Sequence, residues 1–88
     1  TKEDDYTLTS TDSIILAATT DDSFTITLPT AVGIAGRQYT IKKIDSVSHT
    51  ITIDAYSTET IDGELTQEIT DRYNSITIVS DNSNWNII

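Results

Sequence analysis

Few side chains in this sequence could support catalysis or bind a metal. Cysteine is absent and His49 is the one histidine, so no second histidine is present to share a zinc ion. No Gly-x-Ser-x-Gly motif occurs, which leaves a Ser-His-Asp hydrolase without its usual nucleophile turn. His49 follows a polar stretch, and we interpret it as a solvated turn residue. We therefore expect no catalytic residue, no cofactor and no enzymatic activity.

Acidic side chains occur in groups that invite two further kinds of chemistry. Asp21-Asp22 and the stretch 81–84 (DNSN) offer oxygen ligands of the kind that calcium prefers. The second group lacks the glycine and the distal glutamate of an EF-hand loop. Asp62 and Glu64 form a carboxylate pair of the general kind that glycosidases use. Because Asp, Asn and Ser also bend the backbone themselves, we interpret all three groups as turns without a metal ligand.

Aromatic rings are the remaining candidates for ligand contact, because sugars stack on them. Tyr39 and Trp85 lie within apolar alternation, which favours a core or interface position. Tyr56, in the stretch DAYSTET, breaks the alternation and is the best candidate for an exposed ring. The candidate ligand contacts are therefore Tyr56 and, if the chain end is exposed, Trp85.

Charge and composition restrict the partners and the fold class. The formal net charge is -9, which disfavours nucleic acid and anionic membrane surfaces because both are bound by clustered Lys and Arg. No apolar run approaches the roughly 18 residues that a membrane span requires, so we expect no membrane insertion. Threonine and isoleucine supply roughly a third of the chain and suit a pleated sheet. We expect one all-β domain over residues 1–88, as a module of a longer protein.

Period-2 alternation recurs with turn signals about every 8–12 residues, as in a small antiparallel β-sandwich or barrel-like domain. It places Phe24, Ile26 and Leu28 on one face of their strand and points Ile51 and Ile53 inward. Residues 30–36 (TAVGIAG) are the least strand-like and predict a crossing loop or one helical turn. Asp62-Gly63 predicts a turn between two short pieces anchored by Ile61, Leu65 and Ile69. The expected strands lie within residues 6–9, 12–17, 23–29, 37–45, 49–55, 57–70 (two short pieces), 74–80 and 84–88.

The chain end, ITIVSDNSNWNII, predicts a terminal hairpin. Ile76 and Ile78 would share a face with Trp85 and Ile87 across the strand pair. Several strands carry a further apolar residue on the opposite face. Such residues suggest a second buried surface, for which a homo-oligomer interface is the simplest source. These apolar residues on the opposite face are Ile15 (against Ile14 and Leu16), Ile44, Val79 and Ile88.

The order of these pieces resembles a small β-domain of phage tail-fibre and other virion fibre proteins, which also occurs in phage-like injection particles. The resemblance runs from Tyr6 to the chain end. Its most specific parts are the Leu28-Pro29 strand end with the Gly33…Gly36 loop, residues 59–63 (ETIDG) and residues 80–88. The family typically has glycine where this chain has Asn82. Asparagine tolerates positive φ, so we expect the hairpin to survive.

The resemblance implies a non-catalytic structural or receptor-binding module on a virion, assembled as a homotrimer and able to contact a host cell-surface glycan or another receptor. It fixes no receptor-contact residue. The alternative is a carbohydrate-binding module of a secreted polysaccharide-degrading enzyme. A small hydrolase is a third and weaker interpretation.

Overall fold

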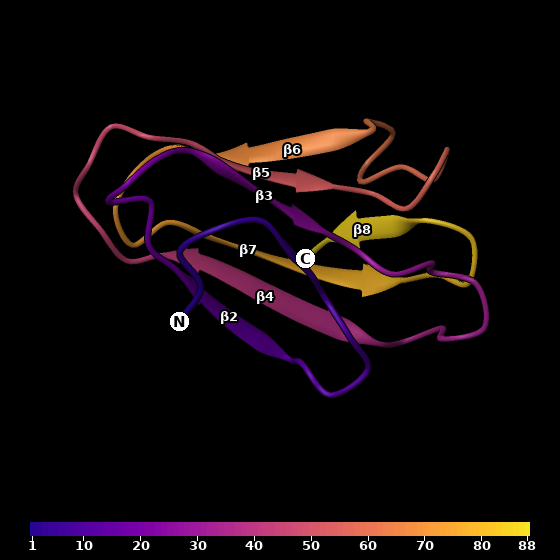
Figure 1. The fold of residues 1–88 in the computed structure, drawn as a ribbon. Coiled ribbons are helices and arrows are strands. Elements are labelled where there is room, and N and C mark those ends of the chain that lie inside the picture. Colours follow the sequence, from indigo (N-terminus) through magenta and orange to yellow (C-terminus); the bar gives the residue numbers. More distant parts are fainter.

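The computed structural model describes all residues, Thr1–Ile88, and contains eight strands and no helix. The strands form two four-stranded sheets, which lie as two layers in Figure 1. Sheet A has the order β2-β4-β7-β8 and sheet B the order β1-β3-β5-β6. No helix of the structure could cross a membrane. The strands are β1 (Tyr6–Thr7), β2 (Ile14–Ala17), β3 (Phe24–Thr27), β4 (Gln38–Lys43), β5 (Ile51–Asp54), β6 (Thr66–Ile69), β7 (Ser75–Ser80) and β8 (Trp85–Ile87).

The strand directions correct the prediction of a mainly antiparallel fold. From β1 to β5 the chain changes sheet after every strand, so each strand returns beside an earlier one in the same direction. Three pairs are therefore parallel, β1 with β3, β3 with β5 and β2 with β4. The second half of the chain adds three antiparallel pairs, β4 with β7, β5 with β6 and β7 with β8. The result is all-β and sandwich-like, with mixed sheets.

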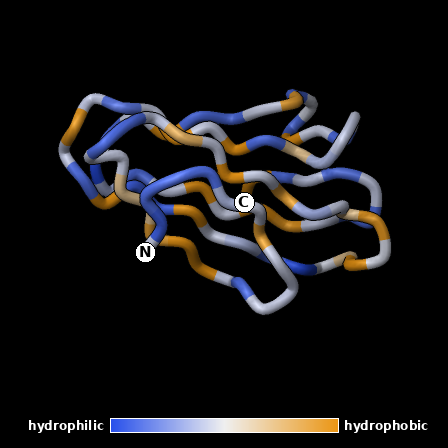
Figure 2. Tube along the Cα trace, in the orientation of Figure 1, coloured by the Kyte–Doolittle hydropathy of each residue, from blue (hydrophilic) through white to orange (hydrophobic).

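One hydrophobic core lies between the two sheets. The predicted inward residues of β3 and β5 are buried, as are Ile61 and Ile69. Leu65 is exposed, which corrects its prediction as an anchor. Figure 2 shows apolar and polar residues alternating along the strands. The core cluster consists of Leu8, Ile15, Ala17, Phe24, Ile26, Leu28, Ala31, Tyr39, Ile41, Ile51, Ile53, Ala55, Ile61, Ile69, Ile78 and Trp85.

The terminal hairpin forms as predicted, and its outer edge is covered. Ile78 pairs with Ile87, and Trp85 is 1% exposed. On the far side of β8, the Trp85 amide donates to the Thr60 carbonyl at 2.8 Å and the Asp62 amide donates to the Trp85 carbonyl at 3.1 Å. An apolar chain end therefore belongs to a strand with hydrogen-bonded neighbours on both sides.

The connections follow the turn chemistry of the sequence. Residues 30–36 form a crossing loop from sheet B to sheet A, without a helical turn. Asp62 and Gly63 both have positive φ, 51° and 86°, as a two-residue hairpin turn requires. Asn82 also has positive φ, 80°, and its side-chain oxygen accepts the Gly33 amide at 2.7 Å. Asparagine therefore suits this turn and ties it to the crossing loop.

Candidate functional site

Each acidic group singled out in the sequence has one carboxylate that binds the protein's own backbone, namely Asp22, Asp62 and Asp81. Asp81 accepts the amides of Ser83 and Asn84 at 2.9 and 2.8 Å, and the Asn84 amide is the main cause of its lowered pKa. Asp62 accepts the Ile87 amide at 2.9 Å. No group of three or more His, Asp or Glu side chains is placed to hold a metal ion. These contacts are those of turn and edge residues.

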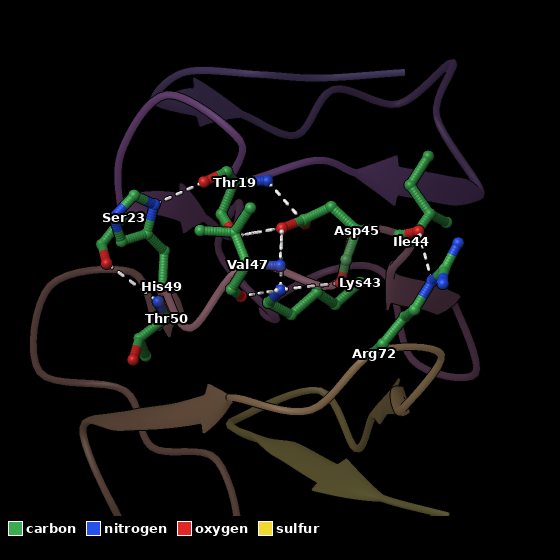
Figure 3. Close-up of polar contacts among 9 residues, drawn as sticks. All are labelled: Thr19, Ser23, Lys43, Ile44, Asp45, Val47, His49, Thr50 and Arg72. Carbon is green, nitrogen blue, oxygen red and sulfur yellow. Dashed lines mark hydrogen bonds and ion pairs between the residues drawn. The ribbon is translucent and has the colours of Figure 1, made fainter.

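A buried polar cluster lies at the end of the sandwich where β2 and β4 leave sheet A (Figure 3). We define it as Thr19, Lys43, Asp45, Val47 and His49. Lys43 is 0% exposed, and its ammonium group donates to the Asp45 carboxylate at 3.0 Å. The same ammonium donates to the backbone carbonyls of Asp45 and Val47 at 3.0 and 2.7 Å. All three ammonium protons therefore have an acceptor.

Asp45 receives more hydrogen bonds than Lys43 supplies. Its carboxylate accepts the Thr19 amide at 2.7 Å, the Thr19 hydroxyl at 3.0 and 3.1 Å and the Val47 amide at 3.0 Å. Burial by itself would raise the pKa of Asp45. The bonds from the Thr19 amide, the Lys43 ammonium, the Thr19 hydroxyl and the Val47 amide outweigh burial and hold this pKa well below its usual range.

His49 extends the polar cluster toward the start of β5. Its Nδ1 atom lies 2.5 Å from the Thr19 carbonyl oxygen. A carbonyl can only accept, so Nδ1 carries the proton. Nearby, the Thr50 amide donates to the Ser23 hydroxyl at 2.8 Å. The cluster thus ties the β2–β3 connection to the β4–β5 connection, and His49 is half-buried rather than the free turn residue that we predicted.

Lys43 is not among the residues singled out from the sequence, although the alternation of its strand indicates that it faces inward. Period 2 places Lys43 on the same face as Tyr39 and Ile41, both of which are buried. A lysine at such a position must either disturb the core or find acceptors there. The acceptors come from Asp45 and Val47, just beyond the strand.

The aromatic candidates separate clearly by exposure. Trp85 packs against Tyr39 with ring centroids 5.7 Å apart and an interplanar angle of 59°. Its burial confirms the core interpretation and corrects the candidate ligand contact, because no ligand can reach the ring from outside. Tyr56 is 51% exposed, so ligand contact through it stays a prediction. The surface has no pocket that could enclose a small molecule.

Tyr73 forms a second exposed aromatic position, and two cations accompany it. Its side chain is 57% exposed. The Lys42 ammonium lies 5.3 Å and the Arg72 guanidinium 4.6 Å from the centre of its ring. The only ion pair of the protein joins Lys43 to Asp45, so neither of these cations has a carboxylate partner.

The outer faces of the two sheets differ in chemistry. Sheet B turns threonines outward with two carboxylates, Asp54 on β5 and Glu68 on β6. The strands of sheet A turn no carboxylate outward. Alternation instead places apolar residues from each of its four strands, or from the residue directly after the strand, on one surface. This apolar face consists of Ile14, Leu16, Thr40, Ile44, Thr77, Val79 and Ile88. The same alternation turns four polar side chains outward beside them, Gln38, Lys42, Ser75 and Asn86.

Strand β2 faces the other way from what the sequence analysis assumed. Ile15 and Ala17 point into the core, whereas Ile14 and Leu16 are exposed at 67% and 40%. The extra apolar residues of β2 are thus Ile14 and Leu16, not Ile15. With this correction, every strand of sheet A contributes to the apolar face.

Comparison with protein-family models and with curated proteins finds no match to this chain. The function is therefore inferred from the fold and its surfaces.

Proposed function

We propose that this domain is a non-catalytic structural and receptor-binding module of a phage or phage-like virion fibre and works as a homotrimer. The observation that carries the proposal is the apolar face of sheet A. Isolated apolar residues on a surface are ordinary, but a set gathered from all four strands of one sheet is typical of an interaction surface.

The central row of this face crosses the whole sheet. Ile14 is in register with Thr40, and Thr40 with Thr77. The two threonine hydroxyls bond each other at 2.9 Å, which satisfies one of their two donors within the face. The row ends at Ile88, whose amide donates to the Thr77 carbonyl at 2.9 Å and which is 66% exposed. A neighbouring subunit would thus contact apolar side chains at both ends of a row that has few unpaired polar groups.

Charge favours another copy of the chain as the partner on this face. Two chains of net charge -9 repel each other wherever their carboxylates meet. The outer face of sheet A carries none from its strands, so copies can approach here with the least repulsion. In a three-fold arrangement the contact is heterologous, so the β2 side of one subunit would face the β8 side of the next. The number three comes from the resemblance to fibre proteins, because symmetry alone favours dimers.

The alternative, a carbohydrate-binding module, finds less support. A carbohydrate-binding module would bind a sugar chain more tightly if it had neighbouring exposed rings on which the sugars stack. The exposed tyrosines of this domain, Tyr56 and Tyr73, follow β5 and precede β7, at opposite ends of the sandwich. Tyr39 and Trp85 form a ring pair, but it is buried.

Sedimentation equilibrium tests the proposal directly. The wild-type chain should have three times its monomer mass of 9.7 kDa at micromolar concentration. A double variant with Ile14→Glu and Ile88→Glu should be monomeric and folded, because both side chains lie outside the core. Thr7→Glu is the matched control, since it adds an acidic residue at an exposed position on the edge strand of sheet B. A monomer that persists on concentration would refute self-association, and a stable dimer would refute the three-fold arrangement.

A further inference from the structure

We propose that Lys42, Arg72 and Tyr73 form a binding site for the isolated acidic groups of a sparsely charged polysaccharide. This inference rests on the proposed receptor-binding function and names the chemistry of the receptor. The residues lie where β4 ends and β7 begins, and Lys42 is in register with Leu16 of the apolar face.

The five cationic side chains of the chain have different environments. Lys43 is buried in its ion pair. The guanidinium of Arg37 donates to the backbone carbonyls of Ser10 and Asp12, and Lys2 lies alone over the ring of Tyr6. Only Lys42 and Arg72 converge on one exposed residue. Arg72 Nε donates to the Ile44 carbonyl at 3.4 Å, but neither Lys42 nor Arg72 has a carboxylate partner. In a chain of net charge -9, two such cations at one exposed ring form a local site for an anion.

The backbone below the site is held firmly. The Tyr73 amide donates to the Lys43 carbonyl at 2.6 Å, and the Lys43 amide donates to the Asn74 carbonyl at 3.1 Å. Because the Lys43 ammonium is anchored in the polar cluster, the 71–74 turn is fixed to the most constrained residue of the sandwich end. A site that is ordered before binding loses less entropy when the ligand arrives.

The conformation of Tyr73 is a separate observation. Its φ is 67°, a left-handed conformation that bulky side chains rarely adopt. Glycine or asparagine would fill this turn position with less strain. Strained residues of this kind cluster at functional sites, and the strain here presents an aromatic ring to solvent between two cations.

The same charges define the class of ligand. Two cations can satisfy one acidic group, whereas a nucleic acid or a heavily sulfated chain brings many and would be repelled by the surrounding carboxylates. The exposed side chains next to the site along the chain are the carboxylate of Asp71 and the neutral hydroxyl and amide groups of Thr70, Asn74 and Ser75. The neutral groups suit sugar hydroxyls, and the carboxylate adds to the repulsion of a densely charged chain. With no pocket on the surface, a single site would bind weakly. Three sites on a trimer would add avidity toward a repeating chain.

A nitrogen-15 NMR titration of the whole chain tests the site. The probes are a trisaccharide with one glucuronic acid residue and the same trisaccharide with glucose in its place. The acidic probe should shift the amide signals of residues 72–74 and the side-chain signal of Arg72, and the neutral probe should not. Because a hydrogen bond to a charged group is worth more than a neutral one, Arg72→Gln and Lys42→Gln should each weaken binding about tenfold.

Two variants control for folding and for general charge effects. Lys2→Gln removes a cation that also lies over a tyrosine ring, 3.9 Å from its centre, and should leave the affinity unchanged. Tyr73→Gly removes the ring while relieving the strain of positive φ, so the domain should stay folded and lose the acidic probe.

Several outcomes would overturn the inference. They are equal shifts with both probes, no shift at residues 72–74, the same weakening by Lys2→Gln, or tighter binding of heparin per acidic group than of the glucuronic acid probe. Failure of this site is separable from failure of the fibre proposal. A trimer without shifts overturns only the site, and a monomer that binds the acidic probe overturns only the trimer.

Discussion

Asp45→Ala should be among the most damaging single substitutions outside the hydrophobic core. It removes the carboxylate partner of an ammonium group that is fully buried. It also leaves three donors without their acceptor, the buried amide and hydroxyl of Thr19 and the partly buried amide of Val47. Removing one partner of a buried ion pair costs about 3–5 kcal/mol, and we expect a loss near the upper end of this range.

Lys43→Met should cost less, although it breaks the same ion pair. The Asp45 carboxylate keeps its three other donors, and methionine fills most of the space of the lysine stem. The loss is then one charge-assisted bond to the carboxylate and two backbone carbonyls left without a donor, for which we expect about 2–3 kcal/mol. The larger loss of stability expected for Asp45→Ala follows from the structure. The Asp45 carboxylate accepts from four donor groups, whereas the Lys43 ammonium has three acceptors.

Urea denaturation followed by tryptophan fluorescence provides the assay. Trp85 is the one tryptophan and lies in the core, so its emission reports global unfolding. A domain of 88 residues has a total stability of about 4–13 kcal/mol, so Asp45→Ala could leave it partly unfolded in water. The double variant with Asp45→Ala and Lys43→Met gives the coupling energy between these two side chains. A loss below about 1 kcal/mol for Asp45→Ala, or a larger loss for Lys43→Met, would refute this account of the polar cluster.

Three further predictions concern acid, the core and the last turn. The pKa of Asp45 is lower in the folded state than in the unfolded state, so on acidification the unfolded state binds the proton first. The unfolding free energy should therefore be at its full value above about pH 5 and fall as the pH is lowered. If the unfolding free energy of Asp45→Asn fell equally steeply with pH, this account would be wrong. Trp85→Ala should cost about 3–5 kcal/mol, as truncation of a buried aromatic does. Because this variant lacks the one tryptophan, its unfolding is followed by circular dichroism, and a melting temperature within a degree or two of wild type would disprove core packing. Asn82→Ala should cost about 1–2 kcal/mol through its positive φ and the lost bond to Gly33, whereas Asn82→Gly loses only the bond, so equal losses would argue against the conformational term.

The sequence by itself determined the fold class, most of the core and the turns. These features are local, because period-2 alternation states which residues share a face and residues such as Asp62-Gly63 state where the chain reverses. The same local rules predicted that Ile51, Ile53 and Trp85 are buried, which the structure confirms. They did not decide which side of a strand faces inward where both sides are apolar, as in β2.

Only the tertiary structure decided strand direction, the partners of Lys43 and the composition of the surfaces. Alternation is the same in parallel and antiparallel strands, so direction depends on which sheet the chain enters after each turn. A lysine in a core position is tolerable only with acceptors in place, and the carboxylate that receives it is itself held by Thr19, 26 residues away along the chain. The apolar face and the cations at Tyr73 likewise join residues from different strands. Such groupings arise from sheet pairing, which no local pattern encodes.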